Sequence, residues 1–387
     1  MGGNAFRKIA VVVVGLFILL QGGTSNAEVS GYVKSLWLNT ETIIGKEESV
    51  EQSINRFRMT WRQPFSKAQI LLSYDIEWQF GDYLATDQYQ LQKQLTPNTY
   101  WELENEWHNK DEEKGSHGLY RAYIRMPVGS VDIRIGRQQL NWSRSFIWSS
   151  FDRFNPYDPL QLEPDERQGV DAVQLVWNRE NGSRVEWVSV GGHSDSEKAS
   201  GIRMRTHIQT TDLDFVLADY GTVRAGGFSA AGQLGSAGWR LEATRNEYEE
   251  TAPTATRSRY NDIVVSMNYT FVSETTLITE LLYRGDGANK PQEYDWLALL
   301  AGKRTDVAKR YIGLIFKQEL DSISGVDITW LYNANDNSYV FLPTVRHSPG
   351  EYEDLHFRIG FQWFKGRTDT EFGRQKPLFF GEMQWFY

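Results

Sequence analysis

The chain has 387 residues and carries 41 lysine or arginine residues against 50 aspartate or glutamate residues, for a net charge of −9 at neutral pH. This acidic balance excludes an ordinary nucleic-acid binder, which would be basic, and the absence of cysteine excludes disulfides and a cysteine-linked lipid anchor. A mean hydropathy of −0.51 excludes a bundle of transmembrane helices. It does not exclude a barrel, because polar lumen-facing residues and loops dilute the apolar signal.

The N-terminus has the parts of a secretory signal peptide. Arg7 and Lys8 form a positive region, Ile9–Leu20 is apolar, and small residues precede the expected cleavage point. The apolar stretch is short for a membrane span, and an uncleaved anchor helix is the alternative. We predict a signal peptide at residues 1–27 and a mature chain at residues 28–387, which holds 39 basic and 50 acidic residues.

The first clear strands alternate between apolar and polar side chains. Gln69–Phe80 places aliphatic and aromatic residues on one face and polar or charged residues on the other, with only Leu71 out of step. Arg56–Arg62 alternates in the same way. Side chains of a strand alternate with period two, so each strand has one apolar and one polar face. Aromatic residues are 14% of the chain, which suits the aromatic girdles at membrane interfaces.

Similar segments recur to the end of the chain. Together with Val29–Leu38 they predict an all-β fold, a transmembrane antiparallel β-barrel of about 18 strands, and a count of 16 is also open. The further candidate strands are Tyr120–Met126, Val131–Ile135, Val173–Trp177, Val185–Val190, Ile202–Ile208, Leu213–Leu217, Arg224–Leu234, Trp239–Arg245, Asn261–Phe271, Leu277–Tyr283, Arg310–Gln318, Val326–Tyr332, Ser338–Val345, Leu355–Trp363 and Leu378–Tyr387.

The connections between these segments alternate between short and long. A barrel of the bacterial outer membrane has short periplasmic turns and long extracellular loops, whereas a soluble sandwich has no reason to sort its loops by parity. The predicted periplasmic turns are Gln63–Lys67, Pro127–Ser130, Asn178–Ser183, Gln209–Asp212, Leu234–Gly238, Val272–Glu274, Leu320–Ser324 and Arg346–Asp354. The long connections include Gly81–Leu119, Asn141–Gly169, Glu247–Arg257, Arg284–Lys309 and Lys365–Lys376.

The C-terminus ends on aromatic residues. Met383, Trp385 and Tyr387 share one face of the last strand. This ending resembles the signal that outer-membrane barrels present to their insertion machinery, although the glycine of that signal would fall at Glu382. The resemblance implies the insertion machinery as a partner and the outer membrane of a Gram-negative bacterium as the location.

The polar faces of the strands predict the lining of the lumen. Many of the lumen-facing residues are arginines. The planar guanidinium group of arginine binds carboxylate or phosphate and stays charged, so the arginines favour anionic solutes. In the alternative reading the arginines pair with lumen carboxylates and only brace the wall. The candidate pore-lining residues are Arg56, Arg58, Arg62, Asp75, Glu77, Arg121, Arg125, Arg134, Arg144 and Arg153.

The segment Gly136–Asp171 mixes five large aromatic residues with arginines and prolines. Long loops in compact proteins are usually functional or disordered, and this one is too aromatic for disorder. We predict that the loop at residues 141–169 folds into the pore mouth and narrows it; the alternative is an ordered extracellular cap.

Arg134-x-Gly136-Arg137-Gln138, followed by this aromatic and Arg-rich loop, resembles the alginate-export type of outer-membrane barrel and its porin-like relatives. The resemblance implies about 18 strands and an Arg-lined lumen for an acidic polysaccharide. It also implies that Arg134, Arg144 and Arg153, together with Arg137, lie near the constriction. Porin-like relatives carry the same short motif without exporting alginate, so the substrate is not implied.

The chain shows no motif of a catalytic triad, phosphate loop, cofactor site or zinc site, and we predict no catalytic residue, no cofactor and no metal. Acidic residues between Gly81 and Gly118 could bind divalent cations that bridge to lipopolysaccharide, although such a run is more often a solvated face. Outer-membrane lipid, lipopolysaccharide and a small anionic solute or an acidic polysaccharide are the expected partners. A channel leads the functional hypotheses, ahead of a dedicated exporter or a component of a secretion or electron-transfer complex, and of a structural barrel.

Overall fold

The computed structural model describes residues 27–95, 99–156, 158–163, 166–167, 169–248, 259–300, 302, 304–350 and 352–387. All of the predicted signal peptide except its last residue lies outside these ranges. In the part of the chain that the structure describes, no helix is both long and apolar enough to span a membrane.

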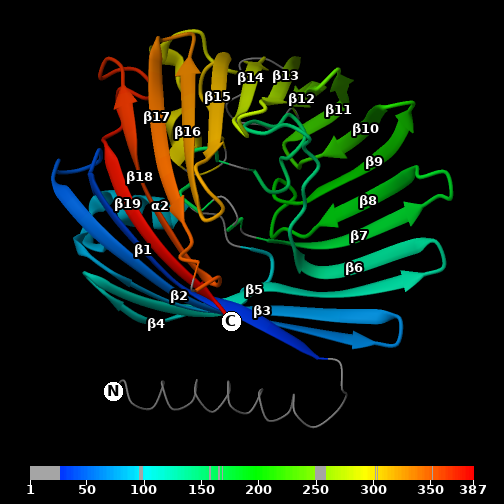
Figure 1. The fold of residues 1–387 in the computed structure, drawn as a ribbon, viewed down its shortest axis with the longest axis horizontal. Coiled ribbons are helices and arrows are strands. Elements are labelled where there is room, and N and C mark those ends of the chain that lie inside the picture. The colour runs from blue at the N-terminus through cyan, green and yellow to red at the C-terminus, as the bar shows by residue number, and fades with distance from the viewer. Residues whose placement is uncertain are drawn as a thin grey trace.

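Within the described residues, nineteen strands form one antiparallel sheet (Figure 1). The strands are β1 (Glu28–Glu41), β2 (Ser49–Phe65), β3 (Ala68–Phe80), β4 (Glu104–Lys110), β5 (Glu113–Val128), β6 (Val131–Gln138), β7 (Val170–Asn178), β8 (Arg184–Val190), β9 (Ala199–Ile208), β10 (Thr211–Asp219), β11 (Val223–Leu234), β12 (Ala237–Tyr248), β13 (Arg259–Thr270), β14 (Thr276–Arg284), β15 (Arg310–Glu319), β16 (Ser324–Asn333), β17 (Ser338–His347), β18 (Leu355–Lys365) and β19 (Leu378–Phe386). The short helices are η1 (Asp82–Ala85), α2 (Asp87–Leu95), η2 (Pro291–Glu293) and α3 (Trp296–Leu300).

The sheet closes on itself through the first and last strands. Val33 of β1 lies opposite Phe57 of β2 and opposite Trp385 of β19. Each wall strand pairs with the next along the chain, and β3 pairs directly with β5. The closed wall therefore has 18 strands, as the sequence predicts. The additional strand β4 continues the sheet beside the first half of β5, beyond the end of β6.

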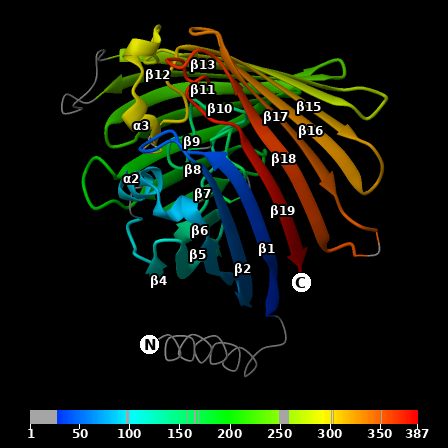
Figure 2. The ribbon, with the colours of Figure 1, turned by 90° about the vertical axis from the view of Figure 1, so that its left-hand side faces the viewer.

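The connections divide between the two ends of the barrel as expected. The turns after β2, β5, β7, β9, β11, β13, β15 and β17 have at most seven residues, and we call this the short-turn end. Two-residue hairpin turns need positive φ angles, which Gly129 (60°) and Gln209 (53°) supply. The opposite, long-loop end carries the described residues of the ranges 81–112 and 285–309. Figure 2 shows the tilt of the strands between the two ends.

The outer face of the barrel is apolar where it would meet lipid. In β13 the buried residues alternate with Ile263, Val265 and Met267, which are 39%, 41% and 49% exposed. This outward apolar series continues to Tyr269 and Phe271, whose rings meet edge to face at 4.8 Å. Roughly nine to eleven residues of a tilted strand cross the hydrocarbon layer, so the series from Ile263 to Phe271 has the length of a membrane-spanning strand.

The predicted alternation of Gln69–Phe80 is confirmed, with one irregularity in its partner. The register of β3 and β5 shifts between Ser73 and Tyr74. A bulge places two residues of one strand opposite one of the other, and here Tyr120 and Arg121 of β5 both contact lumen groups.

Candidate functional site

The described residues of the long connection between β6 and β7, within the range 139–169, lie inside the barrel (Figure 1), and we call them the lumen loop. This agrees with the predicted folding of Gly136–Asp171 into the pore. Its aromatic residues do not line open space: Trp142 and Phe151 are each 1% exposed. Trp142 packs edge to face on Phe154, with ring centres 4.8 Å apart. These rings therefore pack the lumen loop against apolar residues of the barrel wall.

A glutamate from the wall holds the first part of the lumen loop. Glu242 of β12 is fully buried. The backbone N–H groups of Arg144, Ser145 and Ser150 donate to its carboxylate at 2.6, 3.2 and 3.1 Å, and the Ser143 hydroxyl donates at 2.9 Å. A buried carboxylate and buried N–H groups satisfy one another here, which avoids the cost of leaving either unpaired.

A second glutamate repeats this arrangement one hairpin further along the wall. Glu280 of β14 is also fully buried. The consecutive N–H groups of Phe146, Ile147 and Trp148 donate to its carboxylate at 2.9, 3.1 and 2.6 Å. Ile147 and Trp148 then pack on lumen-facing apolar residues of β13 to β17. This side of the lumen is consequently filled by a hydrophobic core.

The sequence reasoning missed these carboxylates. They are single acidic residues on the lumen-facing parity of their strands, namely Glu186, Asp214, Glu242, Asp262 and Glu280, and all are at most 2% exposed. Charged residues are almost never fully buried without partners. An isolated acid at an inward position of a predicted strand was therefore the signal that could have identified them.

Two arginines that the resemblance places near the constriction, Arg144 and Arg153, attach the lumen loop to the barrel wall. Arg144 contacts Asp214 of β10 and lies 2.9 Å from Asp212. Arg153 lies 2.9 Å from Asp262 of β13. Both guanidinium groups belong to the lumen loop and pair with carboxylates of the wall. Their place near the constriction stays a prediction.

The arginines of β2 follow the alternative reading of paired charges. Arg56 lies 2.7 Å from Glu77 and 2.9 Å from Glu163 of the lumen loop. Arg58 lies 2.5 Å from Asp75 and 2.7 Å from Glu166. Burial alone would raise the pKa of Glu166, but the positive charges of Arg58 and Lys34 lower it to about 2. This cluster fastens the second part of the lumen loop to the wall.

The remaining predicted arginines differ from one another. Arg62 is half-exposed at the short-turn end, 2.7 Å from Glu28. Arg121 is buried, stacks on the ring of Tyr120 at 3.9 Å and donates to the carbonyl of Arg167. Neither residue is free to meet a solute in the middle of the lumen.

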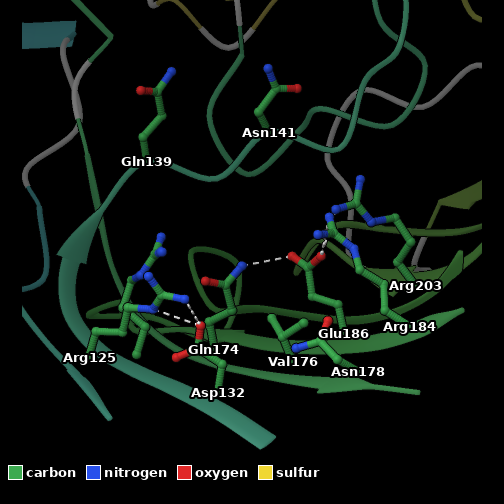
Figure 3. Close-up of a pocket in the computed structure, with 11 residues that line it drawn as sticks. Arg125, Asp132, Gln139, Asn141, Gln174, Val176, Asn178, Arg184, Glu186 and Arg203 are labelled. Carbon is green, nitrogen blue, oxygen red and sulfur yellow. Dashed lines mark hydrogen bonds and ion pairs between the residues drawn. The ribbon is translucent and has the colours of Figure 1, made fainter. Parts of the chain in front are cut away.

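Arg125 and Arg134 line a cavity of about 410 Å³ in the short-turn half of the barrel (Figure 3). Arg125 lies 2.5 Å from Asp132. Arg134 lies over the ring of Tyr123 at 4.9 Å and has no ion pair within the described ranges. The full lining is Arg125, Asp132, Arg134, Gln139, Asn141, Gln174, Val176, Asn178, Arg184, Glu186 and Arg203.

The charges of this cavity do not balance. Four arginines and two carboxylates line it. In Figure 3, Gln174 and Arg203 both point at Glu186, at 2.8 and 2.6 Å. The guanidinium group of Arg184 lies farther away, 3.7 Å from the carboxylate of Glu186. Arg134 has no acidic partner among the described residues, and Arg184 shares its one carboxylate with Arg203, so the cavity keeps an excess of positive charge.

A second cavity, of about 320 Å³, lies toward the long-loop end beside β2, β3 and β5. Its lining contains three arginines and four carboxylates, so it lacks the positive excess of the first. The charged residues are Arg56, Arg58, Asp75, Glu77, Glu104, Arg137 and Glu166.

Arg137 has a structural role at the end of β6. Its guanidinium pairs with Asp171 at 2.9 Å, donates to the Thr99 hydroxyl at 2.7 Å and donates to the carbonyl of Trp101. Asp171 in turn accepts from the Trp101 N–H at 2.8 Å. The buried pair of Arg137 and Asp171 fixes the connection before β4. The charge of Arg137 is therefore balanced by a neighbouring carboxylate.

The acidic connection at the long-loop end neutralises part of its own charge. Glu106 lies 2.8 Å from Lys93 and 3.1 Å from Lys114. No group of three or more potential metal ligands occurs among the described residues. Bridging to lipopolysaccharide through divalent cations, the less favoured of the two interpretations of this segment, stays untested.

No family model matches the sequence, and no curated protein matches it. Solved structures match along almost the whole chain. A BenF-like porin from Pseudomonas fluorescens Pf-5 has a TM-score of 0.63 at 10% identity, covering 94% of this chain and 99% of that one. OccK8 (OprE) of Pseudomonas aeruginosa has a TM-score of 0.61 at 10% identity, covering 94% and 98%. OccK2 (OpdF) of the same species, solved in complex with glucuronate, has a TM-score of 0.60 at 11% identity, covering 93% and 96%.

At these identities the likeness establishes the fold. The chain has the fold of a porin-like β-barrel, and the likeness covers 94% of its length. The narrower resemblance to alginate-export barrels is not supported by these structures.

Proposed function

We propose that the chain is an outer-membrane channel of a Gram-negative bacterium that passes small anionic solutes. The single observation that carries the proposal is the uncompensated charge of the cavity at β5 to β9, where four arginines meet two carboxylates. The predicted signal peptide, the closed barrel and its apolar outer band support the location.

The physical reason for anion preference is the shape of this charge distribution. A narrow aqueous passage with walls of low dielectric constant concentrates ions of the opposite sign, and pore selectivity follows the residues that line the passage. Arg134 and Arg184 offer N–H donors in the geometry that suits a carboxylate. Arginine also keeps its charge at any physiological pH.

The lumen loop argues for small solutes. It is fastened to β12 and β14 through Glu242 and Glu280 on one side, and to β2 through Arg56 and Arg58 on the other. A polysaccharide exporter would need this loop to move aside, whereas the described contacts of the loop hold it against the wall. Because OccK2 was solved with glucuronate, sugar acids of this size are the first solutes to test.

The test is single-channel conductance in a planar bilayer with a KCl gradient, from which the reversal potential gives the ion preference. We expect anion preference in the wild type and a clear loss of it in Arg134→Gln. Arg367→Gln is the control, because Arg367 is an exposed arginine on the connection after β18, pairs with Asp369 and lines neither lumen cavity. Cation preference in the wild type, or equal loss in both variants, would contradict the assignment.

A further inference from the structure

The outer face of the barrel carries a row of charges at the long-loop end. Asp219, Arg224, Glu247 and Arg259 lie directly opposite one another across β10 to β13. Arg224 lies 3.2 Å from Asp219, and Arg259 lies 2.8 Å from Glu247. This row alternates in sign and balances its own charge.

Two arginines nearer the membrane are not balanced in this way. Arg245 of β12 lies between the buried residues Thr244 and Asn246, so its side chain projects outward. It donates to the Asn261 side chain at 3.1 Å. Arg310 precedes the buried Tyr311 and projects outward at the start of β15. Within the residues that the structure describes, neither arginine has an acidic partner.

Apolar surface lies directly below these arginines. Arg310 is opposite Tyr283, which is opposite Ile263. Ile263, Val265 and Leu281 are 39%, 41% and 48% exposed on the same face. Arg245 and Arg310 therefore lie at the edge of the apolar outer band that faces the long-loop end of the barrel.

We propose that Arg245, Asn261, Tyr283 and Arg310, here called the rim site, bind the phosphorylated headgroup of an outer-leaflet glycolipid. The proposal rests on the outer-membrane location proposed above. Arginine binds phosphate through two parallel N–H donors, and basic clusters beside the hydrocarbon layer are typical sites for anionic headgroups.

The spacing of the two arginines favours a headgroup with two phosphates. Their strands, β12 and β15, are three strand spacings apart, roughly 14 Å. A disaccharide phosphorylated at each end can reach both guanidinium groups, while its acyl chains lie over Ile263, Val265 and Leu281. A single phosphate would use only one half of the rim site.

The test measures binding of a synthetic diphosphorylated disaccharide lipid to the purified barrel in detergent by native mass spectrometry. Near the membrane surface one arginine contributes about 1 kcal/mol to binding an anionic lipid. We therefore expect Arg245→Gln and Arg310→Gln each to weaken binding about fivefold, and the double variant to weaken it further. The control is Arg367→Gln, an exposed arginine that pairs with Asp369 on the connection after β18.

Three results would overturn the inference: equal binding of the dephosphorylated lipid, unchanged binding in the double variant, or an equal loss in Arg367→Gln. Inorganic phosphate should compete poorly, since the acyl chains contribute to the contact; strong competition would assign the site to free phosphate instead. The readout is independent of conduction. A barrel that does not conduct but binds the lipid through Arg245 and Arg310 would refute the channel and leave the rim site standing.

Discussion

The structure makes Glu280 the residue on which the closed position of the lumen loop depends most directly. Three consecutive backbone N–H groups, from Phe146 to Trp148, converge on its two carboxylate oxygens, and the Ser266 hydroxyl donates to one of them at 2.6 Å. Glu280→Gln keeps the volume of the side chain and removes one acceptor. It therefore separates the hydrogen bonding of the loop from its packing.

The cost follows from the geometry. In the best arrangement of the new amide, its oxygen accepts from the N–H groups of Ile147 and Trp148. Its NH₂ group then faces the Ser266 hydroxyl, which can rotate and accept a hydrogen bond. The N–H of Phe146 then loses its acceptor in a buried site, at about 1–3 kcal/mol, and the two remaining hydrogen bonds lose their charge assistance. We expect a total loss of roughly 3–5 kcal/mol in the attachment of the loop.

The assay is single-channel recording, in which a loosened loop gives larger and noisier currents, combined with limited proteolysis of the lumen loop. Glu319→Gln is the matched control, because Glu319 is exposed on the neighbouring strand β15 and pairs only with Arg346 in the described structure. Currents and cleavage rates in Glu280→Gln that equal those of the control would refute the argument that this carboxylate holds the loop.

Two further changes test the loops in other ways. Burial raises the pKa of Asp152 to about 7 despite the nearby Arg167. The unfolded carboxyl ionises near pH 4, so this group's contribution to stability is greatest below that pH and is lost as the pH rises to about 7. Asp152→Asn should therefore reduce the fall in unfolding free energy between pH 5 and pH 8, and an unchanged pH profile would contradict this. Asp171→Asn leaves Arg137 buried without its counter-charge, which costs about 3–5 kcal/mol; we expect faster proteolysis at Thr99–Trp101, and unchanged cleavage would show that the pair does not fix this segment.

The wall of the barrel could be predicted from the sequence because lipid on one side and polar groups on the other impose the period of two on every strand. β4 could not be predicted from this pattern, since Trp107 is the one large apolar residue in Glu104–Lys110 and no period of two appears. The position of the lumen loop could also be predicted, because its aromatic residues need burial. Its attachment could not: Glu242 lies 98 residues from Arg144, and no local pattern connects a lone acid in a strand to backbone N–H groups so far away.

The net charge of the chain and the charge of its passage therefore have different origins. The chain is acidic, yet the buried acids of β8, β10, β12, β13 and β14 already accept hydrogen bonds from N–H groups of the loop or pair with arginines that fasten it. A carboxylate engaged in this way repels a passing anion less than its formal charge suggests, because its field is largely cancelled by its donors. In the described lining of the cavity at β5 to β9, Arg134 of β6 has no acidic partner, and Arg184 of β8 lies 3.7 Å from Glu186, which already pairs with Arg203 at 2.6 Å. The ion preference of the channel should then depend on Arg134 and Arg184, and it should be insensitive to the many charges that hold the lumen loop in place.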